Sequence, residues 1–303
     1  MGDYNSQVIM SRVIVVFFAP QELCVFFVVI LEGVVKIVEY PYDKWYKAIQ
    51  VRQSWRQYDG RAVDTDLLLD LSRFLESLNN VYNGVRVILV QESPEDVFKG
   101  VIGSYGKIAG APCYAAFIGN MDDPNVQEKT GYVGELFVLE AASKGLGTCW
   151  IAGFFRPETV KKHIELESNE KILSVTPVGY VSKELKSWDK RLMSFLARSR
   201  KRKLLVELYN GLEQRKWPQW VKEALECARM APSAVNRQPW RFYIETNAIA
   251  VSVGSTLLEG GVSKRLDCGI AMSHIEIGAG AQGRTGSWEY LASPEVARFK
   301  VNS

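Results

Sequence analysis

The chain has 303 residues, 47% of them hydrophobic and 23% charged, which is the composition of a folded globular protein and not of a disordered one. Its 37 basic and 34 acidic residues leave a net charge of +3, too small an excess to indicate a nucleic-acid partner. Five cysteines without a C-x-x-C spacing indicate neither a disulfide framework nor a zinc site and favour a reducing, cytoplasmic compartment. Two histidines, His163 and His274, are too few for a histidine-based metal centre or a Ser-His-Asp triad, and we assign neither a role.

Residues 1–44 form an apolar extension ahead of the main globular pattern, which begins near Trp45. The two apolar runs, residues 13–19 and 23–31, are interrupted by Pro20, and each is shorter than the roughly 20 residues that a membrane helix needs. A basic residue before the first run also fits a signal peptide, but no clear small-x-small cleavage site follows it. We therefore expect a buried strand pair or an upstream extension without a membrane partner, with a membrane or export segment as the alternative.

Helical and β patterns alternate in the first part of the main chain. Asp64 and Thr65 precede a helical pattern and can cap its exposed amides. Asn83-Gly84 then predicts a turn into an apolar, β-branched strand, and Gly145 is placed to end a second helix in the left-handed conformation. The expected elements are a helix at 66–78, strands at 85–90 and 115–118, a helix at 131–144 and a strand at 172–180.

A second round of the same kind follows the basic run at residues 198–203, whose default interpretation is a solvated linker. Both rounds place a tryptophan, Trp150 or Trp288, shortly after a small-residue helix that ends in glycine. This weak internal repeat predicts a duplicated fold, with a first half at 45–197 and a shorter second half at 198–303. The expected elements of the second half are a helix at 219–230, strands at 241–245 and 248–253, and a helix at 266–278.

The first candidate binding segment carries Arg52, Ser54 and Arg56 at alternate positions, which would share one side of an extended strand. Two guanidinium groups and a hydroxyl on one side suit a phosphate or another oxyanion, because arginine donates paired, charge-assisted hydrogen bonds. A solvated strand edge is the alternative, since an R-x-S-x-R string alone is not specific.

The second candidate segment, residues 231–240, lies between a helix and a strand. Pro232 and Pro239 stiffen both ends, while Ser233, Asn236 and Gln238 offer compact donors and acceptors to the polar edge of a planar ligand. A helix-capping turn before an ordinary strand is the alternative. In the third segment, residues 145–153, glycines permit close approach of the backbone to a flat ligand, but the sequence is not a dinucleotide fingerprint.

In this order and spacing, the three segments resemble the nitroreductase family from Trp45 to the C-terminus. More closely, the chain is similar to the branch in which two nitroreductase-like halves are fused, so that one chain imitates the usual homodimer. The Arg-Ser-Arg segment occurs only in the first half and the proline-bracketed loop only in the second. The resemblance implies an α+β, nitroreductase-like fold: two related halves, each with a small mixed or antiparallel sheet flanked by helices, packed as a pseudo-dimer in a monomeric chain with one complete site.

The same resemblance implies FMN as the cofactor. Arg52 and Ser54 would hold its phosphate, and Arg200 or Arg202 would complete the cradle unless the basic run is only a solvated linker. Arg56 would lie near the pyrimidine edge of the flavin, as would Lys107 unless it is a solvent-exposed turn residue. The other implied contacts are Pro232, Ser233 and Asn236 on the ring and ribityl chain, and Ile151, Ala152 and Gly153 beside the reactive nitrogen of the ring.

The implied activity is that of an FMN-dependent oxidoreductase, which takes hydride from NADH or NADPH and reduces a small-molecule acceptor such as a nitroaromatic or a quinone. Such chemistry requires no side chain as general acid or base, so we name no catalytic residue. The alternative from another class is a flavin-binding storage or sensor protein without efficient turnover, because a fold does not fix a function and the second half is short.

Overall fold

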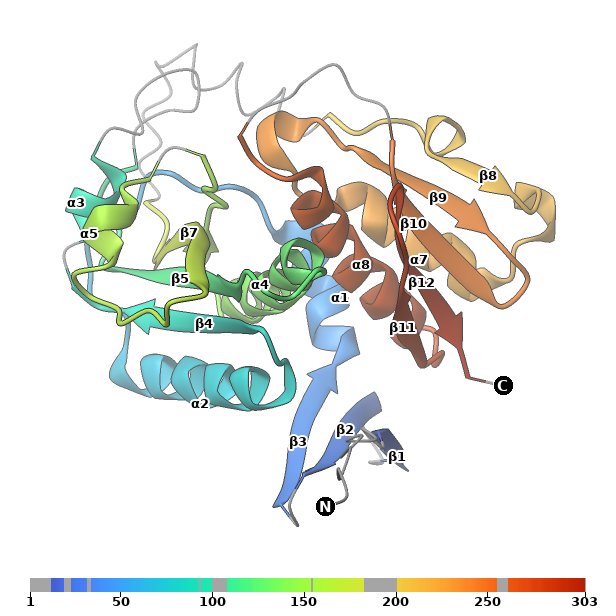
Figure 1. Ribbon diagram of the computed structural model, residues 1–303, viewed down its shortest axis with the longest axis horizontal. Coiled ribbons are helices and arrows are strands. Elements are labelled where there is room, and N and C mark those ends of the chain that lie inside the picture. The colour runs from blue at the N-terminus through green and yellow to red at the C-terminus, as the bar shows by residue number, and fades with distance from the viewer. Residues whose placement is uncertain are drawn as a thin grey trace, which may run out of the picture.

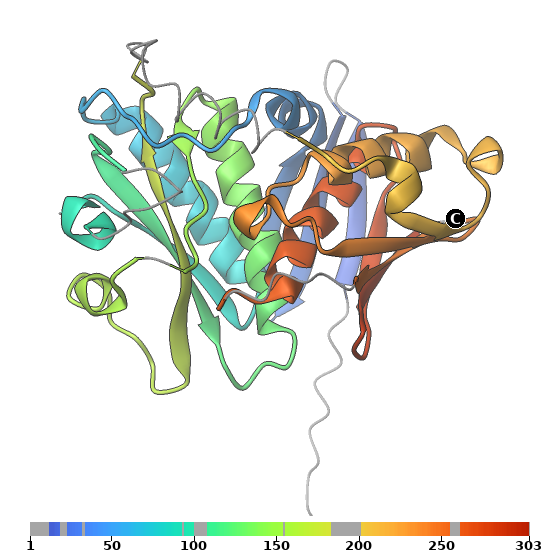
Figure 2. The ribbon, with the colours of Figure 1, turned by 90° about the horizontal axis from the view of Figure 1, so that it is seen from above.

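The computed structural model describes residues 12–18, 23–31, 34–92, 94–99, 108–153, 155–182, 201–254 and 261–302. Two sheets stand on either side of a central pair of helices (Figures 1 and 2). The first sheet has the strand order β4-β5-β7-β6, with every neighbouring pair antiparallel. Its strands are β4 (Val85–Val90), β5 (Cys113–Asn120), β6 (Gly147–Thr148) and β7 (Glu170–Gly179).

Four strands of the second sheet repeat this arrangement in the order β9-β10-β12-β11, and these four pair antiparallel. Its strands are β9 (Trp240–Ile244), β10 (Ala248–Val253), β11 (Gly286–Tyr290) and β12 (Glu295–Val301), and the short β8 (Tyr209–Gly211) joins the edge parallel to β9. The two sheets therefore confirm the α+β fold with two related halves. The second half completes its sheet with less chain because a short turn, residues 291–294, replaces the long connection at 149–169 of the first.

The two central helices, α4 (Val126–Ser143) and α8 (Lys264–Gly280), are buried along almost their whole length. They pack closely where Gly131 of α4 faces the carbonyl of Leu266 and Gly269 of α8 faces the carbonyl of Glu128. A side chain at either glycine would collide with the backbone of the opposite helix, so glycine sets the distance between the halves.

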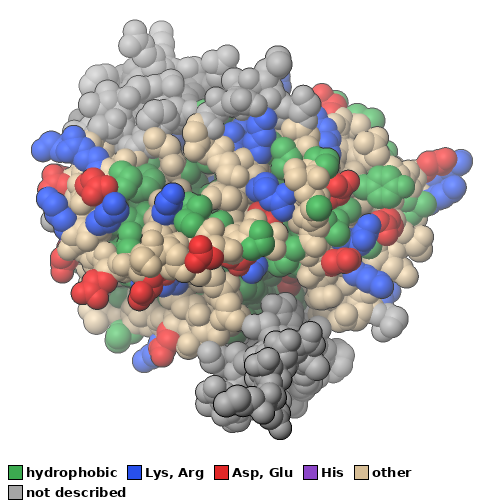
Figure 3. All heavy atoms as spheres, in the orientation of Figure 1, with side chains coloured by type: hydrophobic (Ala, Val, Ile, Leu, Met, Phe, Trp, Pro, Cys, Tyr) green, Lys and Arg blue, Asp and Glu red, His purple; other side chains and the backbone are tan. Residues whose placement is uncertain are grey.

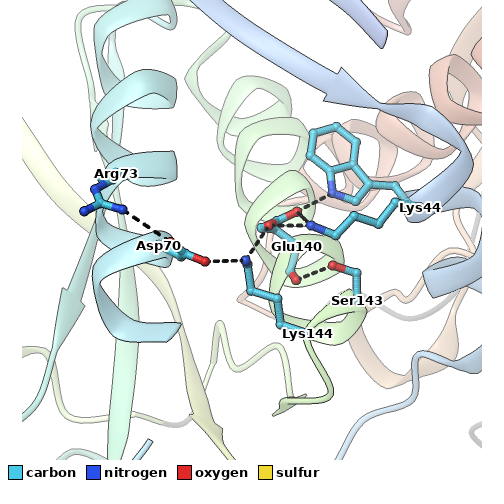
Figure 4. Close-up of polar contacts among 7 residues, drawn as sticks. Lys44, Asp70, Arg73, Glu140, Ser143 and Lys144 are labelled. Atoms are coloured by element: carbon cyan, nitrogen blue, oxygen red, sulfur yellow. Dashed lines mark hydrogen bonds and ion pairs between the residues drawn. The ribbon is translucent and has the colours of Figure 1, made fainter. Parts of the chain in front are cut away.

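Outer helices complete the layers. They are α1 (Tyr42–Val51), α2 (Thr65–Val81), α7 (Gln219–Met230) and the short α3 (Pro94–Phe98) and α5 (Pro157–Val160). Glu140 of α4 ties the first-half helices together, since it accepts hydrogen bonds from Lys44 Nζ at 2.8 Å and Trp45 Nε1 at 2.8 Å, both on α1 (Figure 4). Lys144, just beyond α4, lies 3.5 Å from Glu140 and 3.1 Å from Asp70 of α2, so one network of ion pairs and hydrogen bonds joins α1, α2 and α4.

The N-terminal segment forms an antiparallel sheet of its own, β1-β2-β3, and not the expected pair of strands. Its strands are β1 (Arg12–Phe18), β2 (Leu23–Leu31) and β3 (Val34–Pro41), and β3 runs directly into α1. Across the described ranges, no helix combines the length and apolar character needed to cross a membrane. On the face shown in Figure 3, basic and acidic side chains are interspersed over both halves, in keeping with the small net charge.

Most of the expected elements are present, and α7 and β10 have the expected bounds. The helix expected at 131–144 begins earlier, at Val126, and α1, β6, β8, β11 and β12 were not predicted from the sequence. Asp64 does occupy the N-cap position of α2, but the expected hydrogen bond from the helix amides to its side chain is absent. Its side chain makes no cap bond and instead accepts a hydrogen bond from Tyr180 Oη at 2.7 Å.

Candidate functional site

A cavity of about 1400 Å³ lies where the two halves meet. Its walls come from the end of α1 with residues 52–56, from residues 149–153, from residues 201–204, from the loop after α7 and from the start of α8. Every predicted site residue that the structure describes lines it: Arg52, Ser54, Arg56, Ile151, Ala152, Gly153, Arg202, Pro232, Ser233 and Asn236. Lys107 and Arg200 lie outside the described residues.

The arginine-serine segment leaves α1 at its C-cap, Arg52, whose backbone N–H donates to Ala48 at 2.8 Å. The expected regular strand is absent here: Ser54 forms only an isolated bridge with Thr148 of β6, where Trp55 N–H donates to Thr148 at 2.8 Å. The bridge cannot lengthen because β6 is a two-residue strand. It nevertheless brings the first and third sequence segments side by side at the cavity wall.

Arg52 lies against a buried carboxylate. Its side chain is 5% exposed, and its Nε is 3.8 Å from Oε1 of the fully buried Glu135. Glu135 also accepts a hydrogen bond from Trp150 Nε1 at 2.6 Å and lies 2.9 Å from His274 Nε2. Because His274 Nδ1 is 2.8 Å from the Cys227 carbonyl, which can only accept, this nitrogen carries a proton. Sequence reasoning missed Glu135, although an acidic residue inside an otherwise apolar helix could have indicated it.

Arg202 faces the same cavity from the start of the second half. It donates from Nη1 to Asn236 Oδ1 at 3.2 Å and from Nη2 to the Met230 carbonyl at 3.1 Å. Burial, together with smaller effects from the positive charges of Arg52 and Arg229, lowers the pKa of Arg202 to about 10. The solvated-linker interpretation is therefore wrong for Arg202, and likewise for Lys203, whose Nζ donates to two backbone carbonyls of the adjacent loop.

The loop after α7, residues 231–239, is strained. Val235, Asn236 and Gln238 all have positive φ angles, of 49°, 57° and 48°, a conformation that disfavours side chains and above all the β-branched valine. Asp267 of α8 holds the loop by accepting from Ala234 N–H at 3.0 Å and from Arg237 Nε at 2.7 Å. The loop thus does more than cap α7, because its strained backbone is fixed by partners from outside it.

Two residues with roles expected from the resemblance also make contacts within the protein. The Asn236 side chain donates to the Lys201 carbonyl at 2.8 Å and accepts from Arg202, so it fastens the start of the second half to the loop. The backbone of Ile151 pairs with Val175 of β7 through both its N–H and its carbonyl, at 2.9 Å each, so its amide is already engaged. Ala152 and Gly153 follow it along the cavity wall.

The cavity therefore combines arginines from both halves, the buried Arg52 side chain and the half-buried Arg202, with a wall formed by residues 149–153. Like charges held close together favour an anionic ligand. The fold and this shared cavity define a two-half α+β protein whose candidate site suits a ligand with an anionic group.

The model of the family described as "Putative TM nitroreductase" matches residues 44–279, so this chain belongs to that nitroreductase family. The resemblance stated from the three segments is thereby confirmed, and the family places the chain among the oxidoreductases. Comparison with curated proteins gave no match.

Solved structures with this fold include a "putative nitroreductase" from Thermotoga maritima MSB8, with 18% identity and a TM-score of 0.58 over 86% of this chain and 94% of that one. A nitroreductase family protein from Clostridium novyi NT has 20% identity over 46% of this chain and 86% of its own, with a TM-score of 0.39. An FMN-dependent nitroreductase from Clostridium difficile R20291 has 16% identity over 47% and 91%, with a TM-score of 0.37.

Proposed function

We propose that this chain is an FMN-dependent oxidoreductase of the nitroreductase type, which takes hydride from NADH or NADPH and reduces a nitroaromatic, a quinone or another flat acceptor. One observation carries the proposal: residues of all three sequence segments, from both halves, line a single cavity. Its volume of about 1400 Å³ exceeds the roughly 300–1,000 Å³ of ordinary ligand pockets, which leaves room for a cofactor together with an acceptor.

The residues present fit the phosphate of FMN. Arg52 lines the cavity, and its buried Nε makes no hydrogen bond with a described residue; its polar contact in the structure is the 3.8 Å ion pair with Glu135. Arg52 and Arg202 are close enough for the charge of the first to lower the pKa of the second. A phosphate between them would relieve this repulsion and accept paired hydrogen bonds. Ser54 lines the same wall and offers a hydroxyl donor.

Except for Asn236, which the resemblance places on the ring and ribityl chain, the other lining residues are assigned as the family resemblance implies. Arg56 would stand at the pyrimidine edge, with Lys107 as a further candidate there and Arg200 as one at the phosphate. Asn236 would act through Arg202, which it already holds. The remaining contacts proposed for the ring and ribityl chain are Pro232, Ser233, Ile151, Ala152 and Gly153.

Bound FMN would supply the hydride-accepting and electron-donating chemistry. The chain contributes position and charge: Arg56 would stabilise negative charge at the pyrimidine edge, more strongly in a partly dry site than in water. Trp150, held by Glu135, and the strained loop would shape the space for a flat acceptor. We propose a cytoplasmic chain that acts as a monomeric pseudo-dimer.

A flavin storage or sensor protein is the second candidate. The short second half was one argument for it, but that half completes its sheet, so this argument no longer holds. The two are separated by anaerobic titration of the purified yellow protein with NADH and NADPH, followed by steady-state assays with menadione and nitrofurazone. An enzyme is bleached by a pyridine nucleotide and recovers its colour on addition of the acceptor. Protein that carries FMN but that neither nucleotide bleaches would overturn the enzymatic proposal.

A further inference from the structure

The two halves correspond to each other residue by residue near the centre of the molecule. The spacing from Gly131 to Gly269 equals that from Trp150 to Trp288, and each glycine faces a carbonyl of the opposite helix in the same way. Both tryptophans also donate from Nε1 to a buried glutamate, Trp150 to Glu135 at 2.6 Å and Trp288 to Glu276 at 2.7 Å. The two glutamates themselves do not obey this spacing, which pairs Glu135 with Ser273 and Glu276 with Val138. If each residue is replaced by its equivalent in the other half, the cavity falls on a second position, at the other side of α4 and α8. We call it the counterpart position.

By the same spacing, Ile270 and Ala152, which line the cavity, correspond to Tyr132 and Tyr290. Two small or medium side chains of the cavity thus become phenol rings at the counterpart position. Tyr132 is 4% exposed and its ring lies 5.6 Å from that of Tyr82 between centroids. Tyr82 stands directly after α2, the helix that corresponds to α7. A tight turn follows α2, whereas a longer loop follows α7.

The polar atoms at this position bind one another. Glu276 accepts from Tyr132 Oη at 2.8 Å and from Tyr42 Oη at 3.3 Å, in addition to Trp288. The hydroxyl of Tyr40, the one tyrosine of β3 and 1% exposed, is hydrogen-bonded to that of Tyr82. Burial raises the pKa of Tyr40 and of Tyr132 well above the ordinary value, with a smaller contribution from Glu276, so these hydroxyls remain neutral donors.

The charged groups around the two glutamates differ. In the cavity, the glutamate that holds Trp150 lies beside Arg52, whereas the glutamate that holds Trp288 lies among tyrosine hydroxyls. A phosphate placed there would meet a carboxylate and closed, mutually satisfied donors.

We propose that this cluster, Tyr40, Tyr82, Tyr132, Glu276 and Trp288, seals the counterpart of the cavity, which explains at the level of residues why the chain would have the single complete site that the resemblance implies. Tyr40 gives the N-terminal segment a role, because β3 contributes this side chain to the cluster. The identity of the ligand rests on the proposed function, but the seal itself does not.

Flavin stoichiometry and a residue exchange test the consequence for binding. Titration of the apoprotein with FMN should saturate at one equivalent, and saturation at two overturns the proposal. Ile270→Tyr, which places the counterpart's tyrosine in the cavity, should weaken FMN binding ~10-fold or more through overpacking, whereas Ile270→Leu should retain it. Unchanged FMN affinity in a folded Ile270→Tyr protein also overturns the proposal, since a tyrosine at this position would then not exclude the ligand.

Tyrosine nitration tests the seal without any flavin. With tetranitromethane and peptide mapping, the 55% exposed Tyr243 should react, while Tyr40 and Tyr132 should not. Tyr40→Ala should make Tyr132 reactive, and Tyr40→Phe, which keeps the ring, should leave it protected. Nitration of wild-type Tyr132 at the rate of Tyr243 overturns the seal. Failure of wild-type protein to bind FMN refutes the proposed function instead, and the nitration pattern then decides the seal alone.

Discussion

Replacement of Arg52 by alanine removes one of two guanidinium groups proposed to hold the flavin phosphate. Its side chain is 5% exposed, so solvent offers little compensation for the lost contact. Hydrogen bonds to charged groups contribute about 1.5–3 kcal/mol, which corresponds to roughly ten- to a hundredfold in affinity. We expect the dissociation constant of FMN to rise by that factor, measured by quenching of flavin fluorescence on titration with apoprotein.

The fold should survive this replacement, because Glu135 keeps its contacts with Trp150 and His274 after the arginine is gone. Circular dichroism and the melting temperature check this directly. Arg73→Ala on α2, where the side chain is 74% exposed, is the matched control and should leave FMN affinity unchanged. If folded Arg52→Ala protein binds FMN as tightly as the wild type, the proposed phosphate cradle is wrong.

Three further predictions concern other parts of the chain. Asn236→Ala, in the opposite half from Arg52, should also weaken FMN binding, because it releases Arg202; the same fluorescence titration measures it. Burial raises the pKa of Asp267 from its ordinary 3.8 to about 6, against the opposing effect of Arg237. Ionisation of Asp267 therefore opposes folding, and its contribution to stability should fall as the pH rises from about 4 to about 6, as urea melts of wild type and Asp267→Asn would show. Gly131→Ala should destabilise by about 1–3 kcal/mol or more because the new methyl group meets the backbone of α8, whereas Gly261→Ala, with open space around it, should not.

Each of these has a clear contrary result. Full flavin occupancy in the Asn236 variant would contradict a site shared between the halves. Parallel pH profiles for wild type and Asp267→Asn would contradict the raised pKa of the buried carboxyl group. Equal urea midpoints for the two glycine variants would show that the central helices can move apart without loss of stability.

Periodicity and turn residues predicted the elements whose apolar pattern is strong. The helix at 219–230 and the strand at 248–253 were located with the bounds that the structure shows. β11 and β12 were missed because their residues alternate between buried and exposed faces with charged side chains among them, so they lack the long apolar run by which β4 was recognised. β6 is too short for any pattern to be visible.

The sequence by itself determined the duplicated α+β plan and the residue types of the site. Arginines, a serine, glycines and a proline-bracketed loop are chemical features that can be read one position at a time. Only the tertiary structure decided which of them line one cavity, that Arg202 is hydrogen-bonded to Asn236, and that Glu135 lies beside Arg52. It also decided that Tyr132 fills the position that Ile270 leaves open, because such contacts join residues far apart in the chain and depend on how two close-packed helices bring the halves together.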